Sequence, residues 1–525
     1  MLEGFMSSNE EKNDILQDMA TEPIITECAE DFILPDYLPE IRKLIRVDAL
    51  PVSSGHYVGG EEVEWAGHIA YTLLYTDSEG KLTAVPLRTD YSYKAPVKEG
   101  TPYAIIYQES AEQVKCHPAG PRKVSLRCRL YARPHLYTKK DAQEPIEALL
   151  PQEMPIEKLP YITETANVFS VFSEEHNEEV SFTLDGFSEE ALQIKTVDAS
   201  VMTESAKCEN GKIVCRGYIH VELLADDGAS LLPQTKKIPF ETELLEDGIR
   251  AGDSALLYGH ILSLESEVRG RENGAEACVY LSYSLAAEAW RNTPITLYTD
   301  AYAQGFSLML TSKPQKITRF VGAFSSNFTL SCDGNAECEE NATYAVLSAK
   351  LLPQSSSLSL SGNKAIVAGD MKASVLSECI VGEGSKRIEE NNFIFPYRLE
   401  CDFSTVFSPE DEGIFTLTPL FASAKREGEA LSVVGEVGLT VKVLRKETVA
   451  LPEKIDADTL PASDGKDSIR IYYPTAKDSL WSVGKKYNVP LASLLASNGI
   501  SEEDAKEPSN PKSLDGYLWL LVDAL

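Results

Sequence analysis

The chain has 525 residues, of which 43% are hydrophobic and 25% charged, and its formal net charge is −32. This length predicts several domains, and the composition is that of a globular protein. The negative charge disfavours binding to nucleic acid and to anionic lipid surfaces. No apolar run approaches the roughly 18 residues of a membrane-spanning helix, so no direct membrane span is predicted.

The N-terminus, residues 1–23, is predicted to be disordered. It has no basic start followed by an apolar stretch, so we expect no secretory signal and a protein that stays where it is made. Ten cysteines are scattered without any C-x-x-C pair, and we interpret them as free thiols rather than metal ligands or disulfides. They are Cys28, Cys116, Cys128, Cys208, Cys215, Cys278, Cys332, Cys338, Cys379 and Cys401.

The first clear element is a strand at residues 63–75, "VEWAGHIAYTLLY". Apolar side chains alternate from Val63 to Tyr75, which is typical of a half-buried strand. Gly67 stands in the middle of the apolar face, where it gives the core no side chain. A bulge, a bend or the close approach of another backbone would explain it, and a ligand at that backbone is the functional alternative.

The same pattern returns twice, as "IVCRGYIHVEL" (213–223) around Gly217 and "AIVAGDMKASV" (365–375) around Gly369. The three glycines lie 150 and 152 residues apart, at the same phase of the alternation. "DALPV" begins 19 residues before Gly67 and "DASVM" 19 residues before Gly217, with "SAKLL" at Ser348 as a looser third copy. We therefore interpret the three glycines as structural residues of a duplicated domain.

Many short strands with turn signals predict all-β sandwich or barrel units. Before the third repeat, "LPEIRKLIRVD" (38–48) is the best candidate for a short helix. Two segments rich in proline and acidic residues are interpreted as linkers. The predicted order is a disordered 1–23, unit 1 at 24–140, a linker at 141–178, unit 2 at 179–300, a degenerate unit 3 at 310–446, a linker at 447–467 and a separate domain at 468–525.

The last segment reads as strand, helix, helix, strand, a small α+β (βααβ) domain. Asp478 or Ser479 would cap the first helix, and the Asn498-Gly499 pair would end the second. Leu480 begins an apolar stripe and is expected in the core. Trp481 lies about 100° further round the helix and is predicted to be a surface anchor for a partner, with capping of the small core as the alternative. From residue 468 onward the net charge is −1, against −31 for the residues before it.

This segment resembles a LysM domain, through Lys477-Asp478-Ser479-Leu480-Trp481 and the closing Asn498-Gly499-Ile500. The resemblance implies that these residues lie near a partner or an N-acetylglucosamine glycan. Lys477 stands where the family usually has glycine, and residues 501–515 form a longer loop than usual. Both changes fall in the glycan-binding loops, so we expect a protein partner first and peptidoglycan as the alternative.

The repeats resemble SPOCS domains, through "LPDYLPEIRKLIRVDA" (34–49), the glycine-centred strand and "GPRKVSLRCRLY" (120–131). Repeated SPOCS units followed by LysM resemble spore-coat morphogenetic proteins of clostridia. This implies a mainly β, non-enzymatic adaptor in the mother-cell cytoplasm, at the forespore surface. Its implied partners are a SpoIVA-like ATPase of the coat's basement layer and other coat proteins.

The sequence names no catalytic residue, cofactor or metal site. It lacks phosphate-binding, dinucleotide-binding, zinc-protease and serine-hydrolase motifs. His68 and His220 flank the repeat glycines and are expected to be solvated. The acidic run at 173–179 is also expected to be a solvated loop, with cation binding as the alternative. A catalytic pair of carboxylates, as in glycosidases, can be brought together by folding alone, and the sequence leaves this alternative open. A cell-wall glycan binder is the alternative to the adaptor.

Overall fold

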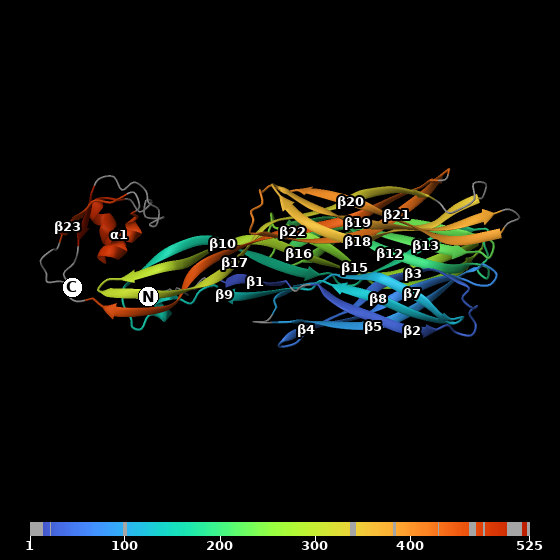
Figure 1. Cartoon of the computed structure of the whole chain (residues 1–525), viewed down its shortest axis with the longest axis horizontal. Coiled ribbons are helices and arrows are strands. Elements are labelled where there is room, and N and C mark those ends of the chain that lie inside the picture. Colours follow the sequence, from blue (N-terminus) through green and yellow to red (C-terminus); the bar gives the residue numbers. More distant parts are fainter. Residues whose placement is uncertain are drawn as a thin grey trace, which may run out of the picture.

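The structure is a computed structural model that describes residues 14–20, 23–97, 102–272, 274–335, 343–381, 385–428, 430–460, 469–475, 478–500 and 517–521. It confirms a mainly β protein, built from antiparallel sheets. In Figure 1 a broad body of strands narrows on one side into a stalk, and the C-terminal helices lie beside the stalk's tip. Within the described residues, no helix is long and apolar enough to cross a membrane.

Unit 1 is formed by two three-stranded antiparallel sheets that enclose a hydrophobic core. One sheet has the order β2-β8-β7 and the other β3-β4-β5. Trp65, Tyr71 and Leu130 lie in the core between them. The strands are β2 (Ile24–Ile33), β3 (Lys43–Val58), β4 (Glu62–Thr76), β5 (Leu82–Pro96), β7 (Glu109–Gly120) and β8 (Lys123–Ala132).

Units 2 and 3 repeat this strand order. In unit 2, β12-β13-β14 corresponds to β3-β4-β5, while β16 pairs with both β11 and β15. In unit 3, β18-β19-β20 corresponds to β3-β4-β5, and β17-β22-β21 corresponds to β2-β8-β7. The strands are β11 (His176–Asp185), β12 (Gln193–Glu209), β13 (Lys212–Asp226), β14 (Leu231–Leu245), β15 (Ser254–Arg271), β16 (Gly274–Ala303), β17 (Phe306–Asn335), β18 (Thr343–Ser361), β19 (Lys364–Val381), β20 (Ser385–Asp402), β21 (Asp411–Glu427) and β22 (Ala430–Thr459).

The three glycines occupy the same place in the central strand of each unit. Gly67 pairs with Ser53 and Tyr91, Gly217 with Thr203 and Phe240, and Gly369 with Ser356 and Tyr397. A Cβ atom at any of the three would lie less than 3.0 Å from a backbone carbonyl oxygen of the neighbouring strand. That strand carries a β-bulge within a few residues in every unit. The close approach of another backbone therefore explains the glycines.

Corresponding positions of the three units also contact one another at the centre of the body. Leu74, Leu224 and Leu376, each seven residues after its glycine, lie in one hydrophobic cluster. The positions 19 residues before the glycines carry charge: Lys350 Nζ lies 3.2 Å from Asp48 Oδ1 and 2.5 Å from Asp198 Oδ2. These two triplets indicate an approximate threefold axis through the body.

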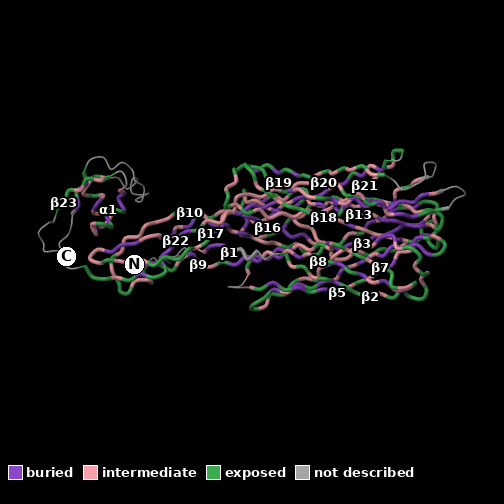
Figure 2. Tube along the Cα trace, in the orientation of Figure 1, coloured by how far each residue is buried: buried purple, intermediate pink, exposed green. Residues whose placement is uncertain are grey.

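The stalk extends two β-ribbons away from the body. β10 (Ile156–Phe172) pairs with the second half of β16, and the first half of β17 pairs with the second half of β22. Leu297, Ile317 and Val449 pack between them. Figure 2 shows buried residues continuing from the body into the stalk. Three shorter elements, β1 (Asp14–Ala20), β6 (Ala104–Ile106) and β9 (His135–Asp141), form a sheet beside it.

The stalk corrects the predicted linkers and part of the predicted disorder. The segment 141–178 contains a 3-10 helix (Ile146–Leu149) and β10, and β22 runs through Thr459. Ile146 and Ile455 are buried together in the stalk. Residues 14–20 form β1, with Ile15 fully buried, whereas residues 1–13 lie outside the described part of the chain. Composition misled here because charged residues cover the outside of a thin, ordered element.

Two further predictions are wrong. Residues 38–42 have no regular structure and β3 begins at Lys43, because pairing with β4 overrides the weak helical pattern. Eight cysteines are free thiols as expected, but Cys379 is disulfide-bonded. Cys338 lies outside the described residues.

Candidate functional site

The C-terminal domain has the predicted order of elements: β23 (Ile469–Tyr472), α1 (Leu480–Tyr487), α2 (Leu491–Asn498) and β24 (Leu518–Leu521). Lys477 lies outside the described residues. The Asp478 carboxylate accepts bonds from the Thr475 amide at 2.7 Å and the Tyr472 hydroxyl at 2.8 Å, and these bonds lower the pKa of Asp478. Ser479 is the N-cap of α1 and forms a capping box with Ser482.

The other residues of the segments 477–481 and 498–500 are also structural. Leu480 is buried with Val483 and Leu494 in the domain core, as expected. The Asn498 amide joins α2 to β24: its Oδ1 accepts from the Trp519 amide at 2.6 Å, and its Nδ2 donates to the Trp519 carbonyl at 2.9 Å. Gly499 ends α2 with φ +63°, and Ile500 packs against the core. These segments therefore specify the fold of the domain.

Trp481 is covered by the stalk, so the prediction of a surface anchor is wrong. Only 5% of Trp481 is exposed. Its Nε1 donates to Asp300 Oδ2 at 2.9 Å, and its ring meets the edge of Tyr302 at 4.9 Å between centroids. Lys485 Nζ lies 2.6 Å from Asp300 Oδ1. Both stalk residues are on β16, about 180 positions earlier in the chain. The helical pattern of α1 therefore could not predict that they cover Trp481.

The stalk also contacts the turn between the two helices. The Tyr302 hydroxyl donates to the Val489 carbonyl at 2.8 Å, and the Leu491 amide donates to Glu157 of β10 at 3.3 Å. A Cβ atom at Gly484 would lie 2.6 Å from the Tyr302 hydroxyl, so a side chain at this position of α1 would force that hydroxyl to move. These contacts fix the C-terminal domain on the tip of the stalk.

Replacing Trp481 by alanine should release the domain without unfolding it. The side chain serves the interface and is not part of the domain core, and truncating a buried interface tryptophan typically costs about 2 kcal/mol or more. In NMR spectra of the full chain, domain signals should sharpen because the domain tumbles independently. Trp519→Ala, which alters the far face, is the control and should leave them broad. Unchanged line widths in Trp481→Ala would contradict this interface.

The far side of the domain is an exposed apolar face that we had not predicted. Ile471 pairs with Trp519 across the two strands, and Tyr517 meets Trp519 and Tyr473 at ring distances of 5.6 and 6.2 Å. With Ile469, these five residues form the aromatic face, and all are more than a third exposed. The alternation in "IRIYY" and "GYLWL" could have predicted this face. It places these side chains on one side of the two strands and the buried Leu518 and Leu520 on the other.

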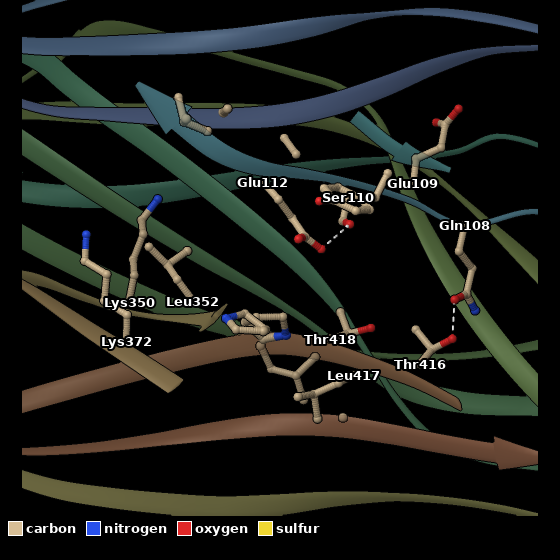
Figure 3. Close-up of a pocket in the computed structure, with 18 of the residues that line it drawn as sticks. Gln108, Glu109, Ser110, Glu112, Lys350, Leu352, Lys372, Thr416, Leu417 and Thr418 are labelled. Carbon is tan, nitrogen blue, oxygen red and sulfur yellow. Dashed lines mark hydrogen bonds between the residues drawn. The ribbon is translucent and has the colours of Figure 1, made fainter. Parts of the chain in front are cut away.

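A second candidate site is a cavity of 940 Å³ where the three units meet. We call it the central cavity. Its wall includes residues 44–49 of β3, 108–116 at β7, 257–260 of β15 and 415–420 of β21. Figure 3 shows Lys350 and Lys372 reaching it from β18 and β19, opposite Glu112. Sequence reasoning missed this site because its residues come from all three units.

The histidines and acidic clusters give no metal centre. Among the described residues, no group of three or more His, Cys, Asp or Glu side chains is placed to hold a metal ion. His220 is buried against Phe421 at 4.9 Å between ring centroids, so its predicted exposure to solvent is wrong. His68 is half-buried. In the run 173–179, His176 stacks on Tyr283.

Comparison of the chain with protein-family models, with curated proteins and with solved structures found no match. The case for a function therefore depends on the geometry of the two sites and on the resemblance of the sequence motifs.

Proposed function

We propose that this chain is a non-enzymatic adaptor of spore-coat assembly, acting in the mother-cell cytoplasm at the forespore surface. The proposal is supported by the resemblance of the three units to SPOCS domains and of residues 468–525 to LysM. In this proposal the body and stalk are the scaffold, and the C-terminal domain is the docking head. Its partner is the ATPase of the coat's basement layer.

The exposed aromatic face is the observation that carries the proposal. Tyr473 is 71% exposed and Tyr517 51%, beside the apolar side chains of Ile469 and Ile471. Clustered exposed aromatic and aliphatic side chains are the composition of interface cores. The stalk covers the side of Trp481, whereas the aromatic face is exposed and a partner can reach it. We therefore assign the docking role to the aromatic face and not to Trp481.

The test is capture of the purified basement-layer ATPase by the full chain. The double variant Tyr473→Ala/Trp519→Ala should weaken binding about 30-fold or more, as expected when two interface anchors are truncated. Tyr37→Ala is the control, since Tyr37 is the most exposed large hydrophobic residue among the described residues of unit 1 and lies outside the domain. Equal binding by all three proteins would refute docking through the aromatic face.

Peptidoglycan is the second candidate ligand, because three clustered aromatic rings also offer flat surfaces to sugar rings. Pelleting of the full chain with purified peptidoglycan separates the two functions. The adaptor proposal expects no co-sedimentation. Strong co-sedimentation that is lost in the double variant, together with no binding of the ATPase, would replace the adaptor by a cell-wall glycan binder.

A further inference from the structure

The central cavity exists because unit 1 is more open than its two copies. In unit 3 the edge strands of the two sheets meet, with Ala349 of β18 paired to Ala422 of β21. The corresponding strands share no ladder pair within the described residues of unit 1 (β3 and β7) or unit 2 (β12 and β15), but β3 and β7 are in the least contact of the three pairs. β7 has an irregular bulge between Glu112 and Lys115, with Gln113 at φ +50°. The bulge bends β7 away from β3.

The edges of these two strands face the opening. β3 pairs only with β4, and β7 only with β8, so each has one edge with no ladder partner in the described structure. Consecutive residues of both segments line the cavity, 44–49 and 108–116, whereas a strand that presented only one face would contribute every second residue. Unpaired strand edges are templates for the addition of an extended peptide.

Acidic groups in the cavity wall already have partners. The Glu109 carboxylate accepts from the hydroxyls of Tyr91 at 2.7 Å and Tyr93 at 2.8 Å. Glu390 accepts from Ser374 at 2.6 Å. Asp48 is held by Lys350 and by Arg46, whose Nη2 lies 3.1 Å from Asp48 Oδ2. Burial alone would raise the pKa of Asp48, but Arg46 and Lys350 outweigh it and lower that pKa.

Several basic or polar nitrogen groups in the same wall lack partners. The Arg46 side chain is 5% exposed, and its Nε and Nη1 have no hydrogen-bond partner in the described structure. The same holds for His260 Nε2. Lys372, which lines the cavity, has no ion pair or hydrogen bond with any described residue. A buried guanidinium with two nitrogens that lack hydrogen-bond partners is costly unless an acceptor binds it.

We propose that the central cavity binds an extended acidic peptide segment of a partner protein. The segment lies between the open edges of β3 and β7 and makes main-chain hydrogen bonds to them. Its carboxylates engage Arg46 and Lys372. The volume of 940 Å³ is far larger than a single small anion needs, and the buried wall atoms that lack a hydrogen-bond partner are nitrogens of Arg46 and His260. The inference does not depend on the aromatic face or on the proposed partner there.

The test is calorimetric titration of the full chain with a capped hexapeptide that alternates valine and glutamate. Binding should weaken about tenfold or more when the glutamates are replaced by glutamine, because charge-assisted hydrogen bonds are lost. N-methylation of alternate backbone amides should have a similar effect, since it removes the donors of a β-ladder. Equal affinity for the acidic and glutamine peptides would overturn the proposal.

Variants of the chain locate the site. Lys372→Gln should weaken binding of the acidic peptide about tenfold, and it removes no ion pair or hydrogen bond with a described residue, so folding should survive. Arg46→Gln should weaken it at least as much, with circular dichroism to check the fold. Lys425→Gln is the control, because Lys425 is exposed on β21 and lies outside the cavity wall. If Lys372→Gln and Lys425→Gln both bind like the wild type, or if succinate binds as tightly as the peptide, the proposal is wrong.

Discussion

Replacement of Gly67 by alanine is expected to destabilise unit 1 by about 3 kcal/mol, the upper end of the usual cost of overpacking. The new methyl group would collide with the Val52 carbonyl oxygen, and it would lie 2.6 Å from the Tyr91 hydroxyl. A side chain could turn away, but a carbonyl in a sheet moves only with its strand. Thermal denaturation of the full chain, with hydrogen exchange on β4, measures the effect.

Gly60→Ala is the matched control for this substitution. Gly60 lies in the turn between β3 and β4, and a Cβ atom there would meet nothing within 4 Å. Its effect should stay within about 0.5 kcal/mol. Gly217→Ala and Gly369→Ala should reduce stability by a similar amount to Gly67→Ala, because a Cβ atom at each would collide with a backbone carbonyl oxygen. If Gly67→Ala and Gly60→Ala denature alike, the glycines are not explained by close backbone approach.

Replacement of Lys442 by methionine should cost about 3–5 kcal/mol, as expected when one partner of a buried ion pair is removed. Lys442 Nζ lies 3.0 Å from both oxygens of Glu288 and donates to the Tyr137 hydroxyl at 2.7 Å. The side chains of Lys442 and Glu288 are 3% and 0% exposed. The pair joins β22 of unit 3 to β16 of unit 2, and Tyr137 joins both to β9. Calorimetric unfolding should show a large loss of stability.

Two further variants decide whether the orphaned charge is the cause. Lys454→Met removes an exposed lysine of the same strand that is paired with Asp456 at the surface, and it should change stability by less than about 0.5 kcal/mol. Adding Glu288→Leu to Lys442→Met removes the unpaired carboxylate and should recover part of the loss. A double variant no more stable than Lys442→Met would show that packing, and not charge, accounts for the effect.

The sequence predicted the units well because alternation and a repeated glycine are local signals. The phase of Gly67, Gly217 and Gly369 was enough to place three strands in equivalent positions. The prediction of linkers was wrong because most residues of a thin stalk face solvent, so its sequence is as polar as that of a linker. Ile146 and Ile156 are partly or fully buried in it, yet they stand between prolines and glutamates that resemble a linker.

The candidate sites were harder to predict, because each depends on residues far apart in the chain. The position of Trp481 off the apolar stripe was interpreted as exposure. In the structure, this side of α1 is buried as well, because Asp300 and Tyr302 of the stalk cover Trp481. Similarly, no pattern around Arg46 indicates that Lys372 faces the same cavity. The repeat did contain one unused signal: Lys350 stands at the position of Asp48 and Asp198.

The lysine at this position of unit 3, where units 1 and 2 have aspartate, has a consequence for the ancestry of the chain. Three separate, identical copies of unit 1 assembled around the same axis would bring three aspartates together, and like charges at that distance repel. Burial would lower the pKa of Lys350, but Asp198 and Asp48 outweigh it and raise that pKa. A single gene with three copies lets one copy diverge and supply the cation. The fusion therefore allows an asymmetric centre that no homotrimer of one unit could encode.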